Sequence, residues 1–484
     1  MEKTNQPNFS FLGKSITLRF SRRVYEALEK ELAKDQTKEL LLFGLFSQAK
    51  TADGSVLIVR DLFFPDKEDL IERTSSGVIP SHNFQATVYL IAEQRKEGIL
   101  DVHNHPFHGT PGFSIIDQME SIKNAEYIRK RFRHPVTHAM IVFNRTASSY
   151  DAVVYDRSLE AYRRIDAIEI SGRGIRIRSN KESRLDIAEK DARYSRQEMI
   201  PGWDQTTLSC LKVAVVGAGG NGAHFIQTLV SIGVGTEGWI AAIDPDIIEE
   251  SNIPRIPYAF AEDVGRHKVV VAAEYAHRKN PKVNFYSYPC SVTEAVAIER
   301  IKGASVIICA PDNDGVRKAC NELSVKCMIP MIDLGCDIEI DGKKVSAGGQ
   351  VRVVLPGENA CLVCCRGYDP SSAALELMDD DRKAQHAAQG YVIGHNTNPT
   401  PSVANLNALT SQFGISALLA LVHGQEFGSW DYVHFDQLTG KTITANTKTS
   451  DSCPLCCREG VLGIGDKNNR VESATEPRWS HTGQ

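Results

Sequence analysis

The stretch "LKVAVVGAGGNGAHF", residues 211–225, decides the fold of the larger part of this chain. An apolar run ends in a glycine-rich turn, and a helical pattern follows directly. Gly217, Gly219 and Gly222 would let the backbone approach a phosphate, and the N-terminus of the following helix favours an anion. Asp244 ends the next apolar run and can bind the hydroxyls of a ribose. Taken alone, this pattern suits a nicotinamide-dependent dehydrogenase equally well.

Strands and helices alternate around this turn. We expect helices over residues 220–233 and 268–280, and strands over residues 211–219, 238–246, 283–290 and 305–314. Such alternation predicts an α/β fold with a doubly wound, mostly parallel sheet. The apolar runs 327–338 and 349–357 extend the sheet.

Polar residues downstream of the turn separate the two kinds of nucleotide enzyme. Asn252 and Arg255 follow Asp244, Lys268 comes next, and Asp312 ends a later strand, at the edge where ligands bind in such sheets. Hydride transfer has no need for two cations and a second carboxylate there, whereas an enzyme that handles a triphosphate does. Arg255 and Lys268 would neutralise phosphate charge, and Asp312 would hold Mg²⁺. The sequence therefore predicts an ATP site.

The spacing of these residues, from Asp244 to Asp312, resembles the ThiF/MoeB and ubiquitin-activating family, and so does the motif "RYSRQ" at 193–197. The resemblance covers roughly residues 190–460. It implies a Rossmann-like domain that uses ATP and Mg²⁺ to adenylate the C-terminal carboxylate of a ubiquitin-like β-grasp protein. In the family, the arginine that corresponds to Arg196 reaches the phosphates of the partner subunit's ATP, so the resemblance also implies a homodimer.

A second stretch, "HNHPFHGTPGFSIID" at 103–117, has the residues of a zinc site. His103 and His105 are two apart on an expected strand, so both side chains point to one face. Asp117 follows Ser114 by one helical turn, and a bend between could fold it back toward the histidines. Two nitrogens and one oxygen would leave one coordination position open for water, as in catalytic zinc sites. A glutamate elsewhere in the chain would have to serve as general base.

The pattern H-x-H-P-x7-S-x-x-D resembles the JAMM (JAB/MPN-plus) metalloprotease family over roughly residues 15–160. The resemblance implies an α+β, cytidine deaminase-like domain in which the two histidines and Asp117 hold a catalytic zinc ion. Ser114 would stabilise the tetrahedral intermediate. Glu39, which precedes an early apolar strand, would activate the water; it is assigned by its position alone. The alternative is that the histidines are polar loop residues with ordinary partners.

The cysteines are concentrated in two clusters. Six of the twelve lie in "CLVCC" (361–365) and "CPLCC" (453–457), and none lies in the first 209 residues. A disulfide scaffold would scatter them, whereas paired C-x-x-C motifs indicate a closed, structural zinc site. The expected ligands are Cys361, Cys364, Cys453 and Cys456.

Activating enzymes of the ubiquitin branch also use a cysteine as thioester carrier, in many relatives within a crossover segment. The corresponding segment here, 369–405, contains no cysteine. Cys336 and Cys365 remain candidates for a thioester cysteine. Otherwise the acyl-adenylate would pass directly to a cysteine of a partner or to a sulfur donor.

We expect four parts in the chain of 484 residues: a JAMM-like zinc peptidase domain at 1–165, a linker at 166–192, an adenylation domain at 193–463 and a polar tail at 464–484. Hydrophobic residues make up 42% and the net charge is −5. Neither value favours nucleic acid or an anionic membrane as a partner. The first fifteen residues lack an apolar signal core, and no run of about 18 apolar residues is present, so a cytoplasmic protein is expected.

The leading hypothesis is a bifunctional enzyme of a ubiquitin-like protein pathway. Its zinc-dependent isopeptidase would trim or deconjugate a ubiquitin-like protein, and its second domain would adenylate that protein for conjugation, with a conjugating enzyme as a possible partner. The arrangement resembles bacterial operons for ubiquitin-like conjugation, some of them tied to antiphage defence. A second hypothesis is a sulfur-carrier pathway, in which uncapping and adenylation lead to a thiocarboxylate. A third is a scaffold without catalysis.

Overall fold

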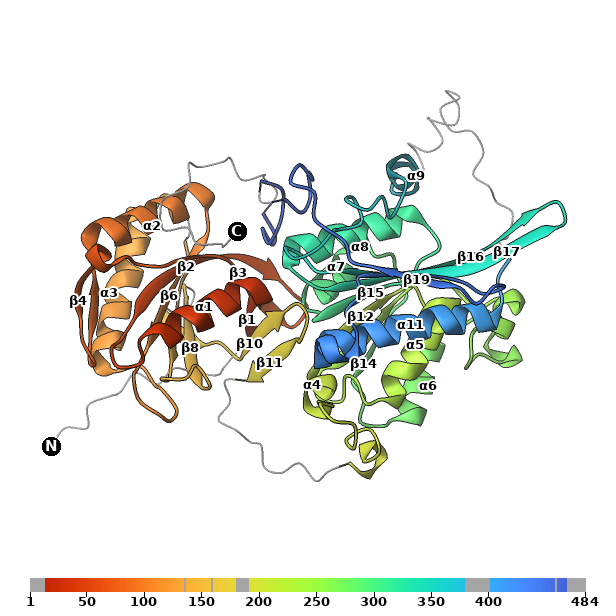
Figure 1. The fold of residues 1–484 in the computed structure, drawn as a ribbon, viewed down its shortest axis with the longest axis horizontal. Coiled ribbons are helices and arrows are strands. Elements are labelled where there is room, and N and C mark those ends of the chain that lie inside the picture. Colours follow the sequence, from red (N-terminus) through yellow and green to blue (C-terminus); the bar gives the residue numbers. More distant parts are fainter. Residues whose placement is uncertain are drawn as a thin grey trace. The chain divides into compact units, whose positions relative to one another are not determined.

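The computed structural model describes residues 14–134, 136–157, 160–179, 191–378, 401–457 and 459–467. The chain divides into two units (Figure 1). Unit 1 comprises residues 1–170, 177–186 and 463–484, and unit 2 comprises residues 171–176 and 187–462.

Unit 1 is built on a nine-stranded mixed sheet in the order β11-β10-β1-β3-β2-β6-β7-β8-β9. Its strands are β1 Ser15–Ser21, β2 Leu41–Lys50, β3 Gly54–Phe63, β6 Gly98–Asn104, β7 His138–Phe143, β8 Tyr150–Asp156, β9 Ala161–Arg164, β10 Ala167–Ser171 and β11 Arg176–Ser179. A separate hairpin pairs β4 Leu70–Arg73 with β5 Val78–Pro80. The helices are α1 Arg22–Lys34, α2 His82–Arg95 and α3 Ile115–Arg131.

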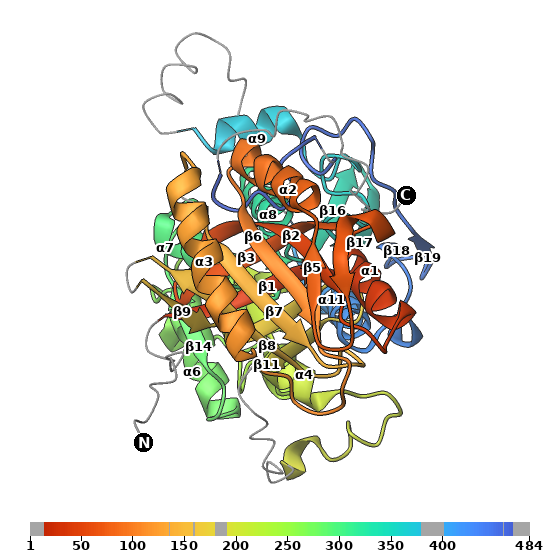
Figure 2. The ribbon, with the colours of Figure 1, turned by 90° about the vertical axis from the view of Figure 1, so that its left-hand side faces the viewer.

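Helices cover both faces of this sheet. The α1 residues Tyr25 and Leu28 are buried in one apolar cluster with alternate residues of β1 and β6, such as Leu18 and Leu100. On the other face, α2 and α3 lie across the central strands (Figure 2), and Ile128 of α3 shares a second cluster with residues of α2, β2 and β6. Because side chains alternate along a strand, β6 contributes to both clusters and is buried along its whole length.

Unit 2 contains an eight-stranded sheet in the order β14-β13-β12-β15-β16-β17-β18-β19. Its strands are β12 Lys212–Val216, β13 Trp239–Ile243, β14 Phe285–Tyr288, β15 Val306–Cys309, β16 Met331–Asp341, β17 Lys344–Val354, β18 Tyr432–Asp436 and β19 Thr442–Ala445. Its helices are α4 Gln205–Cys210, α5 Gly220–Ser231, α6 Lys268–Lys279, α7 Ala295–Lys302, α8 Asp314–Cys327, α9 Pro370–Glu376 and α11 Ala404–His423. The strands from β14 to β16 pair in parallel, and those from β16 to β19 pair antiparallel. The expected doubly wound α/β fold is confirmed, with an antiparallel extension that makes the sheet mixed.

Helix α11 is long and apolar, with a mean hydropathy of 1.3 over its most apolar window. By length and composition it could cross a membrane, yet 61% of that window is buried inside the structure. Thr410, Ser411 and Gly414 are among its buried residues, and Gly414 lies against Phe225 of α5 and Leu334 of β16. These contacts are those of a core helix.

The segment 166–192, expected as a linker, begins with two strands. Ile168 and Ile170 of β10 are buried in the same cluster as α1, and β10 lies next to β1 in the sheet. Two isoleucines spaced by two residues form one apolar face of a strand, which the charged residues around them concealed in the sequence. Strands β10 and β11 therefore occupy most of residues 167–179, and residues 180–190 lie outside the described residues.

Residues Gly463–Lys467, which we call the C-terminal strap, return to unit 1. The Asp466 amide donates to Gln48 O at 3.0 Å, and the Lys50 amide donates to the Asp466 carboxylate at 2.7 Å. Ile464 is fully buried. The strap bonds to β2 just beyond Phe46, where the pairing of β2 with β6 ends. The division between the two units at this end of the chain falls between residues 462 and 463.

The strap also places a cation beside buried charges. Lys467 Nζ lies 3.3 Å from the carboxylate of Glu97, whose side chain is fully buried and also pairs with Arg60 at 2.7 Å. Burial lowers the pKa of Lys467, although the Glu97 charge opposes this shift. A buried carboxylate needs such partners, because an unpaired charge away from water is costly.

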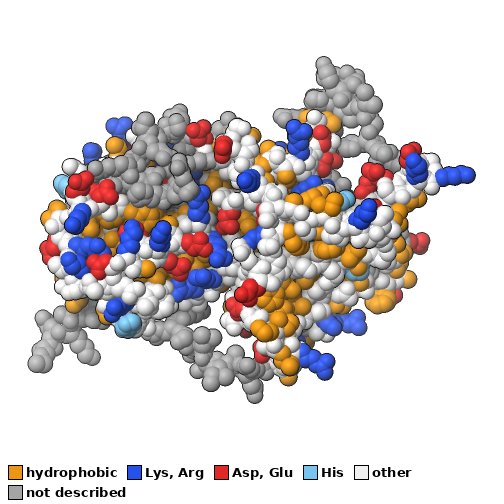
Figure 3. Space-filling view, in the orientation of Figure 1, with side chains coloured by type: hydrophobic (Ala, Val, Ile, Leu, Met, Phe, Trp, Pro, Cys, Tyr) orange, Lys and Arg blue, Asp and Glu red, His pale blue; other side chains and the backbone are white. Residues whose placement is uncertain are grey.

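The surface of both units mixes charges of the two signs. On the face drawn in Figure 3, Lys and Arg side chains are interspersed with Asp and Glu over each unit. This distribution agrees with the small net charge of −5.

Deleting residues 463–484 should loosen the end of β2. The Lys50 amide would lose its carboxylate acceptor and the site of Ile464 would open, so we expect amide exchange over residues 47–50 to accelerate by about tenfold or more. Hydrogen exchange followed by peptide mass spectrometry measures this. Deletion of 468–484 alone is the matched control and should leave exchange unchanged; equal protection in both proteins would show that the strap contributes nothing.

Candidate functional site

The histidine pair and the aspartate converge in unit 1. His103 is the last residue but one of β6, His105 directly follows the strand, and Asp117 lies in the first turn of α3. One carboxylate oxygen of Asp117 is 3.7 Å from His103 Nε2, and the other is 3.7 Å from His105 Nε2. One ligand atom from each residue lies within 4.8 Å of the others. A single metal ion could therefore contact all three.

A capping box sets the orientation of Asp117. Ser114 is the N-cap of α3: its hydroxyl accepts from the Asp117 amide at 3.1 Å, and the Asp117 carboxylate accepts from the Ser114 amide at 2.7 Å. The serine–aspartate spacing of three residues is the spacing that this motif requires. Because the Ser114 hydroxyl accepts in this contact, its own proton is free to be donated elsewhere.

Glu39 lies beside the same cluster, 4.0 Å from His105 Nε2. Burial raises the pKa of its carboxyl group. Asn104, between the two histidines, accepts from the Leu40 amide at 2.8 Å and so ties the Glu39 segment to β6. Sequence reasoning missed Asn104, although its position inside the H-x-H motif was the available signal.

The chemistry of these donors fits a zinc ion. His103 Nε2 is buried and has no hydrogen-bond partner within the described residues. Burial lowers the pKa of His105, which favours the neutral imidazole that binds metal. Burial alone would raise the pKa of Asp117, but His103 and the bonds from Ser114 hold it well below its ordinary value, so the group is a carboxylate. Two imidazole nitrogens and one carboxylate oxygen are donors that suit a zinc ion with one open coordination position.

In the glycine turn of unit 2, other backbone atoms lie too close to Gly217 and Gly222 for a side chain to fit there. Gly217 has a φ of +93°, and a Cβ there would lie 2.5 Å from Ala310 O. A Cβ on Gly222 would lie 1.9 Å from Gly217 O, whereas one on Gly219 would meet nothing within 4 Å. Two of the glycines are therefore required by packing, and the third leaves open space above the turn. Helix α5 begins without a side-chain cap, so its first amides remain available to an anion.

Asp244 braces this turn. Its carboxylate accepts from the Ala218 amide at 2.7 Å and from the Asp246 amide at 2.8 Å. Burial raises the pKa of Asp244, while Lys268 acts in the opposite direction. Lys268 itself pairs with Asp246 at 2.7 Å. The ends of β12 and β13 are thus fixed to each other by one carboxylate.

The remaining expected residues lie on nearby segments. Asn252 and Arg255 belong to a short 3-10 helix at Glu250–Arg255, in which Asn252 is buried and accepts from the Glu249 amide at 3.4 Å. Asp312 follows β15 and is exposed, with a contact of 3.4 Å to Asn313 Nδ2. Because β12, β13 and β15 are parallel neighbours, their carboxyl ends place Gly217, Asp244 and Asp312 along one edge of the sheet.

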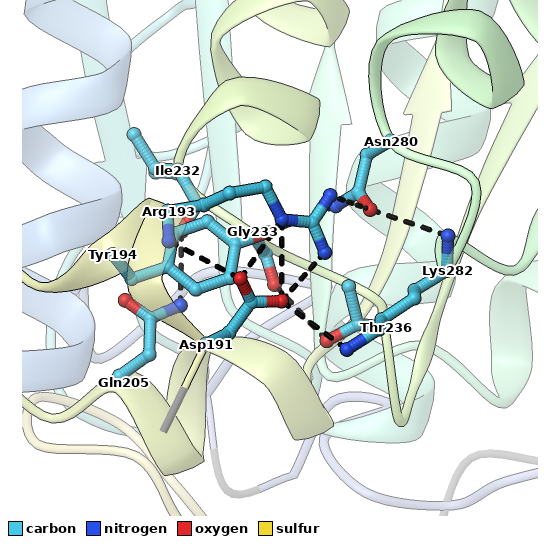
Figure 4. Close-up of polar contacts among 9 residues, drawn as sticks. All are labelled: Asp191, Arg193, Tyr194, Gln205, Ile232, Gly233, Thr236, Asn280 and Lys282. Atoms are coloured by element: carbon cyan, nitrogen blue, oxygen red, sulfur yellow. Dashed lines mark hydrogen bonds and ion pairs between the residues drawn. The ribbon is translucent and has the colours of Figure 1, made fainter. Parts of the chain in front are cut away.

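The "RYSRQ" segment is anchored at two points and presents Arg196 between them. Arg193 donates to Asp191 and to Asn280, and Asn280 in turn donates to the hydroxyl of buried Tyr194 (Figure 4). Gln197 donates to Gln205 at 3.0 Å. Arg196 is exposed and makes no hydrogen bond or ion pair with any described residue.

The four expected cysteines gather in unit 2. Sulfur–sulfur distances are 3.7 Å for Cys361 and Cys453, 3.9 Å for Cys361 and Cys364, and 3.4 Å for Cys364 and Cys456. Hydrogen bonding from Cys456 lowers the pKa of Cys361 to about 5. Four sulfurs at these separations fit a tetrahedral zinc ion. Cys365 and Cys457 are not among the four convergent sulfurs.

The two candidate thioester cysteines have restrained thiols. Cys336 lies 3.4 Å from Asn221 Oδ1 and 3.3 Å from Asn407 Nδ2, and Cys365 donates to Cys361 O at 3.3 Å. Burial raises the pKa of both thiols. All twelve cysteines are buried or half-buried, and none is exposed.

Comparisons with known proteins concern mainly unit 2. The profile of the ThiF family matches residues 194–455. The SAMP-activating enzyme E1 of Haloferax volcanii is 33% identical over 58% of this chain and 94% of that protein. The sulfur carrier protein adenylyltransferase of Thermus thermophilus is 34% identical over 31% of this chain, and the adenylyltransferase and sulfurtransferase UBA4 of Meyerozyma guilliermondii is 31% identical over 39%. This chain spans 55% and 42%, respectively, of the length of these last two proteins.

Replacing Cys361 with serine should remove one equivalent of zinc. Loss of one of four thiolates from a closed site costs a large part of a binding free energy of about 10–16 kcal/mol, so we also expect a lower melting temperature. Metal analysis of the purified protein and a thermal melt measure both effects. Cys365→Ser, one residue outside the cluster, should retain the zinc. An unchanged zinc content in C361S would disprove the assignment.

Proposed function

Because the chain belongs to the ThiF family, we propose that unit 2 uses ATP to adenylate the C-terminal carboxylate of a ubiquitin-like or sulfur-carrier β-grasp protein. The observation that carries this proposal is the edge of the sheet at which Gly217, Asp244 and Asp312 meet. The relatives support it, since they are named for activating such proteins.

The residues of this edge suit a displacement at phosphorus. The glycine turn and the first amides of α5 would bind phosphate oxygens, and Asp244 would accept from the ribose hydroxyls while holding the turn. Arg255 and Lys268 would neutralise the polyphosphate, with Lys268 leaving Asp246. A carboxylate oxygen of the β-grasp protein would attack the α-phosphorus, and pyrophosphate would leave. Asp312 would hold Mg²⁺, which offsets the charge on the leaving group.

Arg196 supports a homodimer in this proposal. It is exposed and unpaired among the described residues, on a segment fixed by Tyr194 and Gln197 on either side. A cation held in this way is suited to reach the phosphates in the site of a second subunit.

Lys268→Ala and Asp312→Ala should each lower ATP–pyrophosphate exchange by about 10²–10³-fold, because each removes a charge that stabilises the transferring phosphate. The assay uses the purified chain, Mg-ATP, labelled pyrophosphate and a panel of ubiquitin-like and sulfur-carrier β-grasp proteins with free C-termini. Lys279→Ala, at the exposed far end of the same helix as Lys268, should exchange normally. Exchange by the wild type that persists in both variants would place the ATP site elsewhere.

We further propose that unit 1 is a zinc-dependent peptidase that cleaves after the C-terminus of the same β-grasp protein, in a precursor or a conjugate. A bound zinc ion would polarise the scissile carbonyl and lower the pKa of a water molecule. Glu39 would take the proton from water and pass it to the leaving amine. The free proton of the Ser114 hydroxyl would be donated to the developing oxyanion.

Glu39→Gln should lower hydrolysis of a C-terminally extended β-grasp protein by about 10²–10⁴-fold, the usual contribution of a general base, while zinc content is retained. Asp117→Asn should lose both the activity and the metal. Intact mass spectrometry of the substrate gives the cleavage site. Glu120→Ala, exposed on the same helix as Asp117, is the control. Cleavage by wild type, E39Q and D117N alike would identify a contaminating protease.

The burial of the cysteine thiols favours transfer of the acyl group to another molecule after adenylation, instead of to a cysteine of this chain. No cysteine of the chain is exposed, and both candidate carriers have raised pKa values. The acyl group would then pass from the adenylate to a thiol or persulfide of another molecule: a carbon–sulfur bond forms, the carbon–oxygen bond to AMP breaks, and the thiol proton is released. Intact mass analysis of the exchange reaction distinguishes this route, since a reductant-sensitive adduct on this chain would establish a thioester carrier instead.

A further inference from the structure

A chain of buried polar groups lies behind the histidine pair of unit 1. His138, at the start of β7, is 1% exposed. Its Nε2 lies 2.9 Å from Asp101 Oδ2, and its Nδ1 lies 2.5 Å from the Tyr162 hydroxyl. That hydroxyl donates to Ser121 O at 2.8 Å. The proposed hydrolysis uses none of these groups.

Proton counting fixes the direction of the two bonds at Tyr162. The hydroxyl of Tyr162 has one proton, and the Ser121 carbonyl can only accept it. Toward His138 the hydroxyl must therefore accept, so Nδ1 donates. The other ring nitrogen, Nε2, forms the hydrogen bond with Asp101 Oδ2. His138 and Tyr162 thus link Ser121 of α3 to Asp101 of β6 through three consecutive hydrogen bonds.

The two ends of this chain lie on the two elements that carry the expected metal ligands. Asp101 precedes His103 by two residues in β6, so both side chains are on the same face of the strand. Ser121 follows Asp117 by one helical turn in α3. His138 of β7 and Tyr162 of β9 supply the side chains that link these ends.

We propose that Asp101, His138 and Tyr162 are positioning residues that set the separation between Asp117 and the histidine pair, and with it the affinity of the site for zinc. The proposal rests on the proposed peptidase function. Helix α3 begins at the capping box, and its first two turns carry exposed apolar residues such as Ile116 and Met119. The bond from Tyr162 to Ser121 O fixes the second turn of α3 against β9. The bond from His138 to Asp101 fixes the same assembly against β6.

Packing alone does not require these groups. Asp101 Oδ1 is buried and has no hydrogen-bond partner among the described residues, which is a cost that an apolar side chain would avoid. Neighbouring Met140 and Val142 fill the same face with apolar atoms. A buried polar chain that links two ligand-bearing elements resembles the outer groups that orient metal ligands, whose loss typically weakens metal binding by about 10–100-fold.

The test measures zinc affinity in the full-length chain. Competition with a zinc-binding dye measures the affinity for each bound zinc ion. The ion that the wild type binds and His103→Ala does not is the one at the histidine site, and the other belongs to the cysteine cluster. Tyr162→Phe deletes only the hydroxyl, and we expect its zinc affinity to fall by about 10-fold or more. Tyr155→Phe, whose ring lies 5.3 Å from that of Tyr162, is the matched control and should bind as the wild type does.

Two substitutions of Asp101, at the β6 end of the polar chain, distinguish a positioning role from general misfolding. Asp101→Asn keeps an acceptor for His138 and should retain more zinc affinity than Asp101→Ala. Equal zinc affinity of wild type, Y162F and D101A would overturn the positioning role even if the variants melt at lower temperature. If wild type and His103→Ala contain the same zinc, the peptidase proposal fails first. If the wild type binds a zinc ion that His103→Ala lacks, and Y162F and D101A bind that ion equally tightly, only the positioning role is disproved.

Discussion

Both candidate sites depend on one constraint: a polar side chain that the fold buries must be given a partner. In unit 2 the Asp244 carboxylate, 6% exposed, accepts from two backbone amides and thereby holds the glycine turn open toward the edge of the sheet. In unit 1 every residue of β6 is buried, so Asp101, His103 and Asn104 each require neighbours on α3, β7 or the Glu39 segment. Removal of a partner would leave an unpaired group in a medium where it is costly. The positions of the functional side chains follow from these local requirements.

The parts of the site that the sequence predicted are those with short-range signals. Each of these signals predicts a backbone geometry or a set of donor atoms from a segment of about twenty residues. They are the glycine turn, the polar residues at strand ends and the C-x-x-C pairs. The H-x-H motif and the Ser114–Asp117 spacing likewise coincide with a strand end and a capping box. Here the pattern and the local physics agree, so the expected residues do come together.

What the sequence did not reveal depends on contacts between distant segments. The bond between Ser47 and Gly463 joins residues separated by 416 positions, and no periodicity marks either of them. Asn104 pairs with Leu40, 64 positions away. His138 and Tyr162 read as ordinary strand residues until β7, β9 and α3 are placed together. The strands β10 and β11 were hidden for a different reason, since two isoleucines among charged residues give too weak an alternation to outweigh a linker-like composition.

If both proposals hold, the fusion itself favours one order of reactions. Hydrolysis of a peptide bond after the β-grasp C-terminus is downhill and produces the free carboxylate that adenylation consumes, so trimming feeds the activating unit. Deconjugation by the same chain would instead remove what ATP had been used to attach. Tethering raises the local concentration of each unit's product near the other. A high local concentration helps when trimming is followed by activation, but it wastes ATP when conjugation is followed by deconjugation. The covalent link between the units therefore argues for a precursor as the principal substrate of unit 1.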